Sequence, residues 1–327
     1  MNSMMKVFDM HCDTIGRLYE LSQDECLKEN SLNIDILKMS KGHYLAQCFA
    51  MFVPYTVDNL FETCMDMIDR FYCELDANYE TIRLARNVDD IERNAREGRL
   101  SAILTVEEGG VIKGHLSYLR DLYRLGVRMI TLTWNYENGI GFPNYNMALN
   151  TDCFIPNTQD GLTSFGIEMV QEMNRLGMII DVSHLSDAGF YDVLKYTQGP
   201  FVASHSNARS LCPHCRNMSD DMIKQLALRG GVIGINYCAD FLRNPQEDNF
   251  SYIRDIVKHI QYIVKIGGID CVGLGSDFDG IPQNLEMKDA SYLPMLEVAL
   301  KDAGFSEEDI EKIFYKNVLR VFKEVLG

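Results

Sequence analysis

The chain has 327 residues, of which 46% are apolar and 24% are charged. These fractions are close to the averages of soluble globular proteins, about 45–50% and 25%, and they exclude the disordered, collagen-like and coiled-coil classes. Lysine and arginine number 31 against 47 aspartates and glutamates, which gives a formal charge of −16. The summed field repels polyanions, so nucleic acid is not an expected partner.

Eight apolar runs rich in β-branched and aromatic residues predict strands along the chain. The expected strands span residues 7–13, 44–53, 100–107, 127–134, 178–184, 201–206, 231–237 and 271–278. Most of them are near-continuous apolar runs, which is typical of parallel strands covered by helices on both faces.

Amphipathic segments lie between these runs and predict helices. The expected helices span residues 59–85, 116–125, 164–176, 186–196, 219–228, 252–266, 292–303 and 306–326. Ser186, Ser219 and Ser306 are expected N-caps, and glycine follows several helices, as at Gly126 and Gly177. Eight strand–helix units predict an α/β fold of the (β/α)8 TIM barrel type. No linker interrupts the chain, so we expect one domain over residues 1–327.

Polar side chains occur where the predicted strands end, which in such a barrel is where the active site lies. Residues two apart on a strand share a face, so His11 and Asp13 are expected to point into the mouth together, and Cys12 away from it. The full set of histidines and carboxylates at the ends of five strands is His11, Asp13, Glu107 or Glu108, His184, His205 and Asp277.

These residue types together favour a metal site. A lone histidine or aspartate at a strand end is usually a satisfied polar group, but three histidines and three carboxylates at one mouth predict metal binding. Imidazole with carboxylate suits Zn²⁺ and its first-row neighbours better than Mg²⁺ or Ca²⁺. The number of ligands favours a pair of ions, about 3.5–4 Å apart and sharing a carboxylate. Strand parity alone does not choose between Glu107 and Glu108.

Other features indicate the cellular setting. The ten cysteines are scattered rather than set in a short framework, which predicts buried, reduced thiols. No leader pattern is recognised in the first 13 residues, and no run of about 18 apolar residues occurs, which predicts a cytoplasmic protein without membrane contact. Cys212 and Cys215 have the spacing of half a zinc knuckle, but no second pair follows nearby.

Several short motifs resemble those of the membrane dipeptidase (renal dipeptidase) family of zinc peptidases, relatives of the amidohydrolase barrels. They extend over nearly the whole chain. Because neither a secretion signal nor a lipid-anchor tail is recognised, the chain is similar to soluble, bacterial-type members. The motifs are His11-Cys12-Asp13, Val106-Glu107, LRDLYRLGVRMITLTW at 119–134, DVSH at 181–184, SHSN at 204–207, Arg216-Asn217 and GSDFDG at 275–280.

The resemblance implies two zinc ions per chain, bridged by one glutamate. An ungapped count back from Arg120 selects Glu107 over Glu108 for this role. The other implied ligands are, for one zinc, His11 and Asp13 and, for the second zinc, His184 and His205.

The resemblance also implies a substrate and a mechanism. Asp277 matches the acidic residue that handles protons, and Arg216 matches the arginine that receives the C-terminal carboxylate of a dipeptide, a role suited to its planar fork of donors. Trp134 stands where animal members have a histidine beside the substrate, so we expect it to border the substrate here. The implied reaction is metal-assisted hydrolysis of dipeptides, including those with a C-terminal D-residue, by a homodimer.

Two other functions remain open from the sequence. One is another hydrolase of the amidohydrolase type, acting on cyclic amides, lactones or phosphotriesters, whose pocket does not need to bind a free carboxylate at Arg216. The other is a non-catalytic metal-binding barrel in which Trp134 fills the space needed for catalysis. The complete set of metal-site and proton-transfer residues disfavours the second function.

Overall fold

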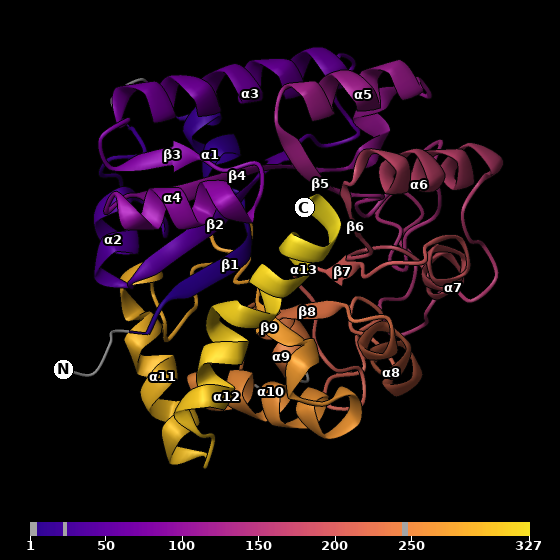
Figure 1. The fold of residues 1–327 in the computed structure, drawn as a ribbon. Coiled ribbons are helices and arrows are strands. Elements are labelled where there is room, and N and C mark those ends of the chain that lie inside the picture. Colours follow the sequence, from indigo (N-terminus) through magenta and orange to yellow (C-terminus); the bar gives the residue numbers. More distant parts are fainter. Residues whose placement is uncertain (1–4, 22–24, 244–247) are drawn as a thin grey trace.

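The computed structural model describes residues 5–21, 25–243 and 248–327. Within these ranges, parallel strands form one sheet that closes into an eight-stranded barrel surrounded by helices (Figure 1). The predicted TIM barrel is therefore confirmed. The barrel strands are β1 (Val7–Cys12), β2 (Tyr44–Phe52), β4 (Leu100–Glu107), β5 (Val127–Thr131), β6 (Ile179–Asp181), β7 (Val202–Ala203), β8 (Val232–Ile235) and β9 (Val272–Leu274).

The strands are paired unevenly around the barrel. β2 joins β4 in continuous register from Ala46↔Ser101 to Phe52↔Glu107. On the other side, β6 joins β7 only at Asp181↔Val202, and β7 joins β8 at two residue pairs. The inter-strand hydrogen bonding is therefore densest around β4 and sparsest around β7.

A ninth strand corrects one sequence prediction. The helix expected over residues 59–85 ends earlier, as α3 (Leu60–Ala77), and is followed by the short strand β3 (Ile82–Leu84). β3 pairs with β4 from Leu100 onward, whereas β5 pairs with β4 only from Leu104 onward. The first part of β4 is therefore not paired with β5. β3 pairs with its backbone N–H and C=O groups instead.

The helices between the strands lie outside the barrel and mostly match the prediction. Ser186 and Ser219 accept hydrogen bonds from the first turns of their helices, and Gly177 ends α6 in the left-handed conformation, so these caps are confirmed. Helices α5 (Leu116–Arg124), α6 (Ser164–Leu176), α7 (Asp187–Tyr196), α8 (Asp220–Leu228), α10 (Ile253–Gly267) and α11 (Leu293–Asp302) were expected. Helices α1 (Thr14–Glu20), α2 (Ile36–Lys41), α4 (Val88–Arg96) and α9 (Ala239–Leu242) were not.

The C-terminal segment covers one end of the barrel. It consists of α12 (Glu307–Glu311), a π-helical turn (Lys312–Lys316) and α13 (Asn317–Leu326), where one helix over 306–326 was expected. Ser306 and Asp309 form the capping box at its start. α13 runs across the ring of strands in Figure 1, and its Phe322 ring lies 4.8 Å from that of Phe8 near the start of β1. This end is closed, which leaves the C-terminal ends of the strands as the open mouth.

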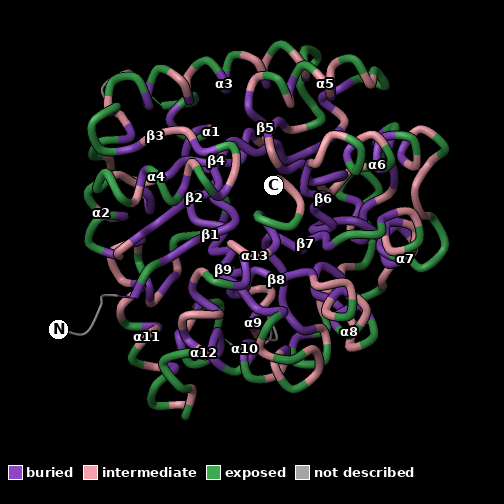
Figure 2. Tube along the Cα trace, viewed as in Figure 1, coloured by how far each residue is buried: buried purple, intermediate pink, exposed green. Residues whose placement is uncertain are grey.

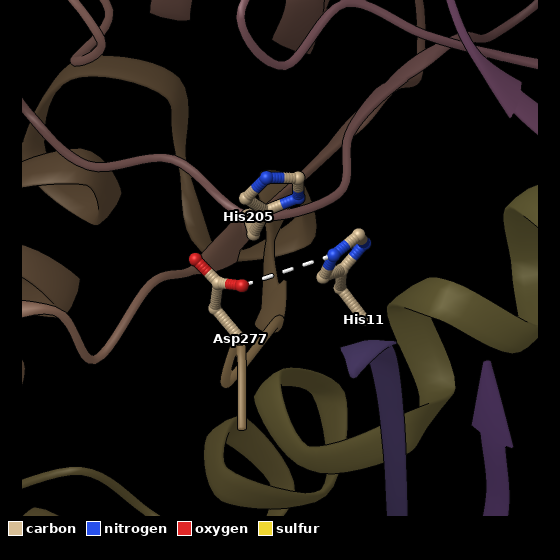
Figure 3. A group of neighbouring side chains, drawn as sticks. All are labelled: His11, His205 and Asp277. Atoms are coloured by element: carbon tan, nitrogen blue, oxygen red, sulfur yellow. Dashed lines mark ion pairs between the residues drawn. The ribbon is translucent and has the colours of Figure 1, made fainter. Parts of the chain in front are cut away.

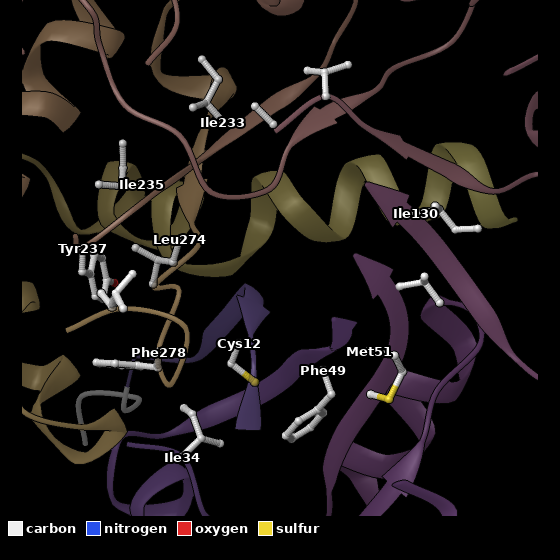
Figure 4. Packing of buried hydrophobic residues seen from close by; sticks show 14 of the residues in the cluster. Cys12, Ile34, Phe49, Met51, Ile130, Ile233, Ile235, Tyr237, Leu274 and Phe278 are labelled. Atoms are coloured by element: carbon white, nitrogen blue, oxygen red, sulfur yellow. The ribbon is translucent and has the colours of Figure 1, made fainter. Parts of the chain in front are cut away.

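The core side chains of β1 are divided between two clusters, and the pairing of β1 with β2 shifts register between Asp9 and Cys12. Phe8 and Met10 of β1 belong to a cluster that packs against α13, whereas Val7 and Cys12 belong to the larger cluster beneath the outer helices. Figure 2 shows buried residues concentrated in the strands, and Figure 4 shows Cys12 among buried side chains such as Phe278. Cys12 therefore points away from the mouth, as predicted.

All ten cysteines are unpaired, but not all are buried. Cys73 is exposed, and Cys26 and Cys153 are partly exposed, so the prediction of buried thiols is wrong for these three. Cys73 lies in α3, where one face of an amphipathic helix meets solvent. No described helix is long and apolar enough to cross a membrane. Residues 1–4, part of the segment searched for a leader, lie outside the described ranges.

Gly275, just after β9, is expected to be intolerant of any side chain. A Cβ atom there would lie 1.8 Å from the carbonyl oxygen of Ser204, so Gly275→Ala requires a backbone shift. We expect it to lower the free energy of unfolding by about 1–3 kcal/mol, the usual cost of overpacking. Thermal unfolding against Gly199→Ala, whose Cβ would meet nothing within 4 Å, measures this loss. Equal unfolding midpoints for the two variants would contradict the expectation.

Candidate metal centre

Five of the predicted ligands meet at the mouth of the barrel around Glu107. Nε2 of His11 lies 3.3 Å from Glu107 Oε2 and 3.4 Å from Asp13 Oδ2. On the other side, Glu107 Oε1 lies 3.0 Å from His184 Nε2 and 3.5 Å from His205 Nε2. All five side chains are buried. Glu107 therefore stands between two groups of ligands and offers one oxygen to each.

Asp277 joins this cluster from the loop after β9. Its Oδ1 lies 3.8 Å from His11 Nε2, and its Oδ2 accepts a hydrogen bond of 2.8 Å from Asn236 Nδ2. Figure 3 shows Asp277, His11 and His205 facing one another. Burial raises the pKa of Asp277 to about 8, although the nearby His11 ring opposes this rise. The carboxyl group can therefore hold or release a proton close to neutral pH.

Several of the site residues, Asp13 and Trp134 among them, lie beyond the strands in which they were predicted. β6, β7 and β9 end two or three residues before His184, His205 and Asp277 are reached, and the predicted strand ends at 184, 206 and 278 are wrong by three or four residues. His184 and Asp277 have φ values of 69° and 61°, and this left-handed backbone cannot continue a strand. Non-glycine residues held in this conformation cost free energy and cluster at functional sites.

The structure distinguishes Glu107 from Glu108. Glu107 is the last residue of β4 and points into the cluster, whereas Glu108 has a φ of 74° and turns away. The Glu108 carboxylate accepts hydrogen bonds from the backbone N–H groups of Gly110 and Trp134 and from the Asn138 side chain. Glu108 therefore organises the neighbouring loops, and Glu107 is the glutamate that belongs to two of the candidate ligand groups.

His184 and His205 face each other through their Nε2 atoms. Their Nε2 atoms are 3.0 Å apart, while their Nδ1 atoms face Asn135 Oδ1 at 2.8 Å and Ser204 Oγ at 2.7 Å. Burial lowers the pKa of His184 to about 4 and that of His205 well below its usual value. Neutral imidazole is the form of histidine that binds metal.

The donor set fits a cation. His11 Nε2 and Asp13 Oδ1 are buried without a hydrogen-bond partner. Although burial opposes it, the Glu107 and Asp13 carboxylates raise the pKa of His11 well above its usual value, because two negative charges beside the ring favour a positive charge there. Three ligand groups in the described chain have donor atoms within 4.8 Å of one another: His11 with Asp13 and Glu107, Glu107 with His184 and His205, and His11 with His205 and Asp277.

A cavity of about 300 Å³ opens over the cluster and is lined by Glu107, His184 and Asp277. Its apolar wall includes Phe52 and Trp134, whose rings are 4.8 Å apart. The Trp134 ring also lies 5.9 Å from that of His184. Trp134 thus lies beside the candidate metal ligands, at the position where we expect a substrate contact.

Arg216 lies one layer behind this lining and is almost fully buried. Its Nη2 donates to the carbonyl oxygen of His205 at 3.1 Å, and its Nε has no partner. None of the described carboxylates lies within ion-pair distance of the guanidinium, and burial lowers the pKa of Arg216. Its guanidinium carbon is 5.4 Å from the Phe241 ring, which lines the cavity. A buried cation with a free donor is suited to binding an anionic group.

Sequence reasoning missed the residues that support the ligands. Asp181, Ser204, Asn135 and Asn236 all hydrogen-bond to side chains of the cluster or to their supports. Asp181 carried a signal, since it is a carboxylate in the apolar run MIID. Ser204 lies in the SHSN motif, whereas Asn135 and Asn236 follow strands as ordinary polar residues.

Cys212 and Cys215, which have the spacing of half a zinc knuckle, belong to none of the candidate metal-ligand groups among the described residues. Cys212 Sγ donates to the backbone carbonyl oxygens of Asp240 and Arg243, and His214 Nδ1 accepts from the Arg216 N–H. The backbone of Arg216 is therefore held by the His214 side chain.

A closed (β/α)8 barrel with buried histidines and carboxylates at its open mouth is typical of metal-dependent hydrolases. The family model Membrane dipeptidase (Peptidase family M19) matches residues 1–326, and the chain therefore belongs to this family of peptide hydrolases.

Individual relatives agree with this assignment. An uncharacterized dipeptidase of Schizosaccharomyces pombe is 35% identical over 314 residues, which cover 90% of this chain and 73% of the relative. A solved structure of the dipeptidase AC, a metallopeptidase of family M19, is 26% identical with a TM-score of 0.91 and covers 99% of this chain and 100% of its own. A metallopeptidase from Rhodobacter sphaeroides, 24% identical over 99% of this chain and 100% of its own, shares the fold with a TM-score of 0.88.

Proposed function

We propose that the chain is a zinc-dependent dipeptidase that hydrolyses the peptide bond of dipeptides at a centre of two zinc ions. The observation that carries this proposal is the position of Glu107, whose two oxygens face two separate ligand groups. Histidine and carboxylate ligands suit zinc. One ion would be held by His11 and Asp13, the other by His184 and His205, with Glu107 shared.

The residues around this centre have separable tasks. Bound zinc would supply Lewis acidity toward the peptide carbonyl and would lower the pKa of water. Asp277 would take up the proton released when water attacks and return it to the leaving amine, as a general base and then a general acid. Asn236 holds one oxygen of Asp277, which keeps the other oxygen directed at the cluster.

Substrate binding follows from the cavity and the buried arginine. Arg216 would receive the C-terminal carboxylate of the dipeptide, and Trp134 would border the substrate on the apolar wall. The Rhodobacter sphaeroides structure is liganded with a phosphinate mimic of the dipeptide L-Ala-D-Ala, which supports testing substrates with a C-terminal D-residue. A homodimer and a cytoplasmic location stay predictions.

Metal analysis combined with a dipeptide assay tests this function. We expect about two zinc ions per chain by mass spectrometry, as in two-metal hydrolases, and cleavage of L,L- or L,D-dipeptides that chelator abolishes and added zinc restores. Zinc binding without dipeptide cleavage would transfer the function to another amide, lactone or phosphoester. Cleavage that resists chelator in a metal-free preparation would contradict the metal mechanism.

A further inference from the structure

His205 is held from behind by a buried chain of hydrogen bonds that starts at a carboxylate. Asp181, the last residue of β6, accepts a hydrogen bond of 2.5 Å on Oδ2 from Ser204 Oγ. Ser204 Oγ in turn lies 2.7 Å from Nδ1 of His205. Asp181 and Ser204 are fully buried, so bulk water does not compete for these bonds.

The other contacts of Asp181 determine the direction of this chain. Its Oδ1 accepts from the backbone N–H groups of Ser183 and Ser204 at 3.0 and 2.8 Å, and its Oδ2 also accepts from the Thr131 hydroxyl at 2.6 Å. A carboxylate that faces four donors acts only as an acceptor. The single hydroxyl proton of Ser204 is therefore directed to Asp181.

Because the Ser204 proton is committed, Ser204 Oγ can only accept a hydrogen bond from His205. The ring proton of a neutral His205 must then lie on Nδ1, which leaves a lone pair on Nε2. Nε2 is the atom that lies 3.5 Å from Glu107 Oε1 and 3.0 Å from His184 Nε2.

We propose that Asp181, acting through Ser204, is a positioning residue that holds His205 in the tautomer able to bind metal. This inference rests on the metal centre proposed above. Hydrogen bonds behind a ligating histidine orient the ring and typically change metal affinity 10- to 100-fold when removed. His184 has no such chain of hydrogen bonds to a carboxylate behind it, since its Nδ1 faces the side-chain amide oxygen of Asn135 in the loop after β5.

Asp181→Asn is the variant that reverses the direction of the hydrogen bonds from Ser204 to Asp181 and from His205 to Ser204 with the least change in side-chain shape. The two backbone N–H groups at Oδ1 keep the asparagine oxygen on their side, so the amide NH₂ group takes the place of Oδ2. There it donates to Ser204, whose own proton then turns toward His205 Nδ1. The ring proton moves to Nε2 and blocks the metal-binding atom. We expect zinc affinity, measured by competition with a chromogenic chelator, to fall about 10- to 100-fold.

A second readout does not involve metal. In the full-length chain labelled with ¹⁵N-histidine and stripped of metal, NMR distinguishes a ring proton on Nδ1 from one on Nε2. We expect the Nδ1–H form of His205 in the wild type and the Nε2–H form in Asp181→Asn. A role for Asp181 in packing alone would leave the tautomer unchanged.

Thr131→Val is the matched control, because it removes the other hydroxyl donor to Oδ2 and leaves Ser204 in place. We expect it to keep the wild-type tautomer and zinc affinity. Ser204→Ala removes the link, so it should weaken zinc binding as Asp181→Asn does, and combining the two should add nothing, as for residues that act in one chain.

An unchanged tautomer in Asp181→Asn, or an equal loss of zinc affinity in Thr131→Val, would overturn the relay. If Asp181→Asn does not fold, wild-type zinc affinity in Ser204→Ala would overturn it instead. A wild-type chain that binds no zinc would overturn the proposed metal centre, while the tautomer comparison would still decide whether Asp181 controls His205.

Discussion

Asp277→Asn is expected to lower kcat for dipeptides about 10²- to 10⁴-fold, the usual contribution of a general acid–base group, while zinc stays bound. Asparagine is close in shape to aspartate, and its oxygen can still accept the hydrogen bond from Asn236 that Oδ2 accepts now. The change therefore removes the capacity to carry a proton and leaves the packing of the loop. Steady-state kinetics and metal content, measured on the same preparation, test this expectation.

The position of Asp277 explains why we assign it to proton transfer rather than to metal binding. Its Oδ1 is 3.8 Å from His11 Nε2, farther than the Asp13 and Glu107 oxygens, and it lines the cavity where substrate would bind. A variant that loses zinc together with activity would instead make Asp277 a ligand. Unchanged kcat would remove it from the mechanism altogether. The thermal midpoint of the variant controls for unfolding.

Arg216→Ala is expected to lower kcat/KM for dipeptides with a free C-terminus by about 10- to 150-fold, which corresponds to the roughly 1.5–3 kcal/mol of a hydrogen bond to a charged group. Its Nε has no partner in the structure, so the guanidinium has a donor left for a substrate carboxylate. Because Arg216 is buried, water competes weakly for that donor. Kinetics with a dipeptide and with its C-terminally amidated form measure the contribution.

The amidated substrate is the control because Arg216 also has a structural contact. Its Nη2 donates to the carbonyl oxygen of His205, so some loss in Arg216→Ala is common to every substrate. The ratio of the two losses isolates the contact with the carboxylate. Equal losses would assign Arg216 to the support of His205 alone and would favour a hydrolase whose substrate has no free carboxylate.

The sequence predicted the barrel and the pair His11 and Asp13 because both depend on local periodicity. The alternation expected over residues 11–13 places His11 and Asp13 together and Cys12 apart, although β1 ends at Cys12 and Asp13 is the N-cap of α1. The convergence of the remaining ligands followed from a general property of barrels, in which the strand ends share one rim.

Other parts of the site could not be predicted, because they depend on backbone turns and tertiary contacts. The left-handed backbone at Glu108 separates it from Glu107, and no residue pattern encodes that turn. His184 and Asp277 adopt the same conformation, three residues after their strands end. β3 forms at the free edge of β4, which arises only when β5 joins β4 late in its length.

The uneven pairing of the strands predicts that the two ligand groups of the site open at different rates. Glu107 ends β4, which is held along its length by β2, whereas His184 and His205 follow β6 and β7, which share a single residue pair. Local opening requires least free energy where the fewest backbone hydrogen bonds must break. We therefore expect fluctuations of the folded chain to release His184 and His205 before Glu107. Exchange of a bound ion with solvent would then begin at His184 and His205, while His11, Asp13 and Glu107 stay assembled.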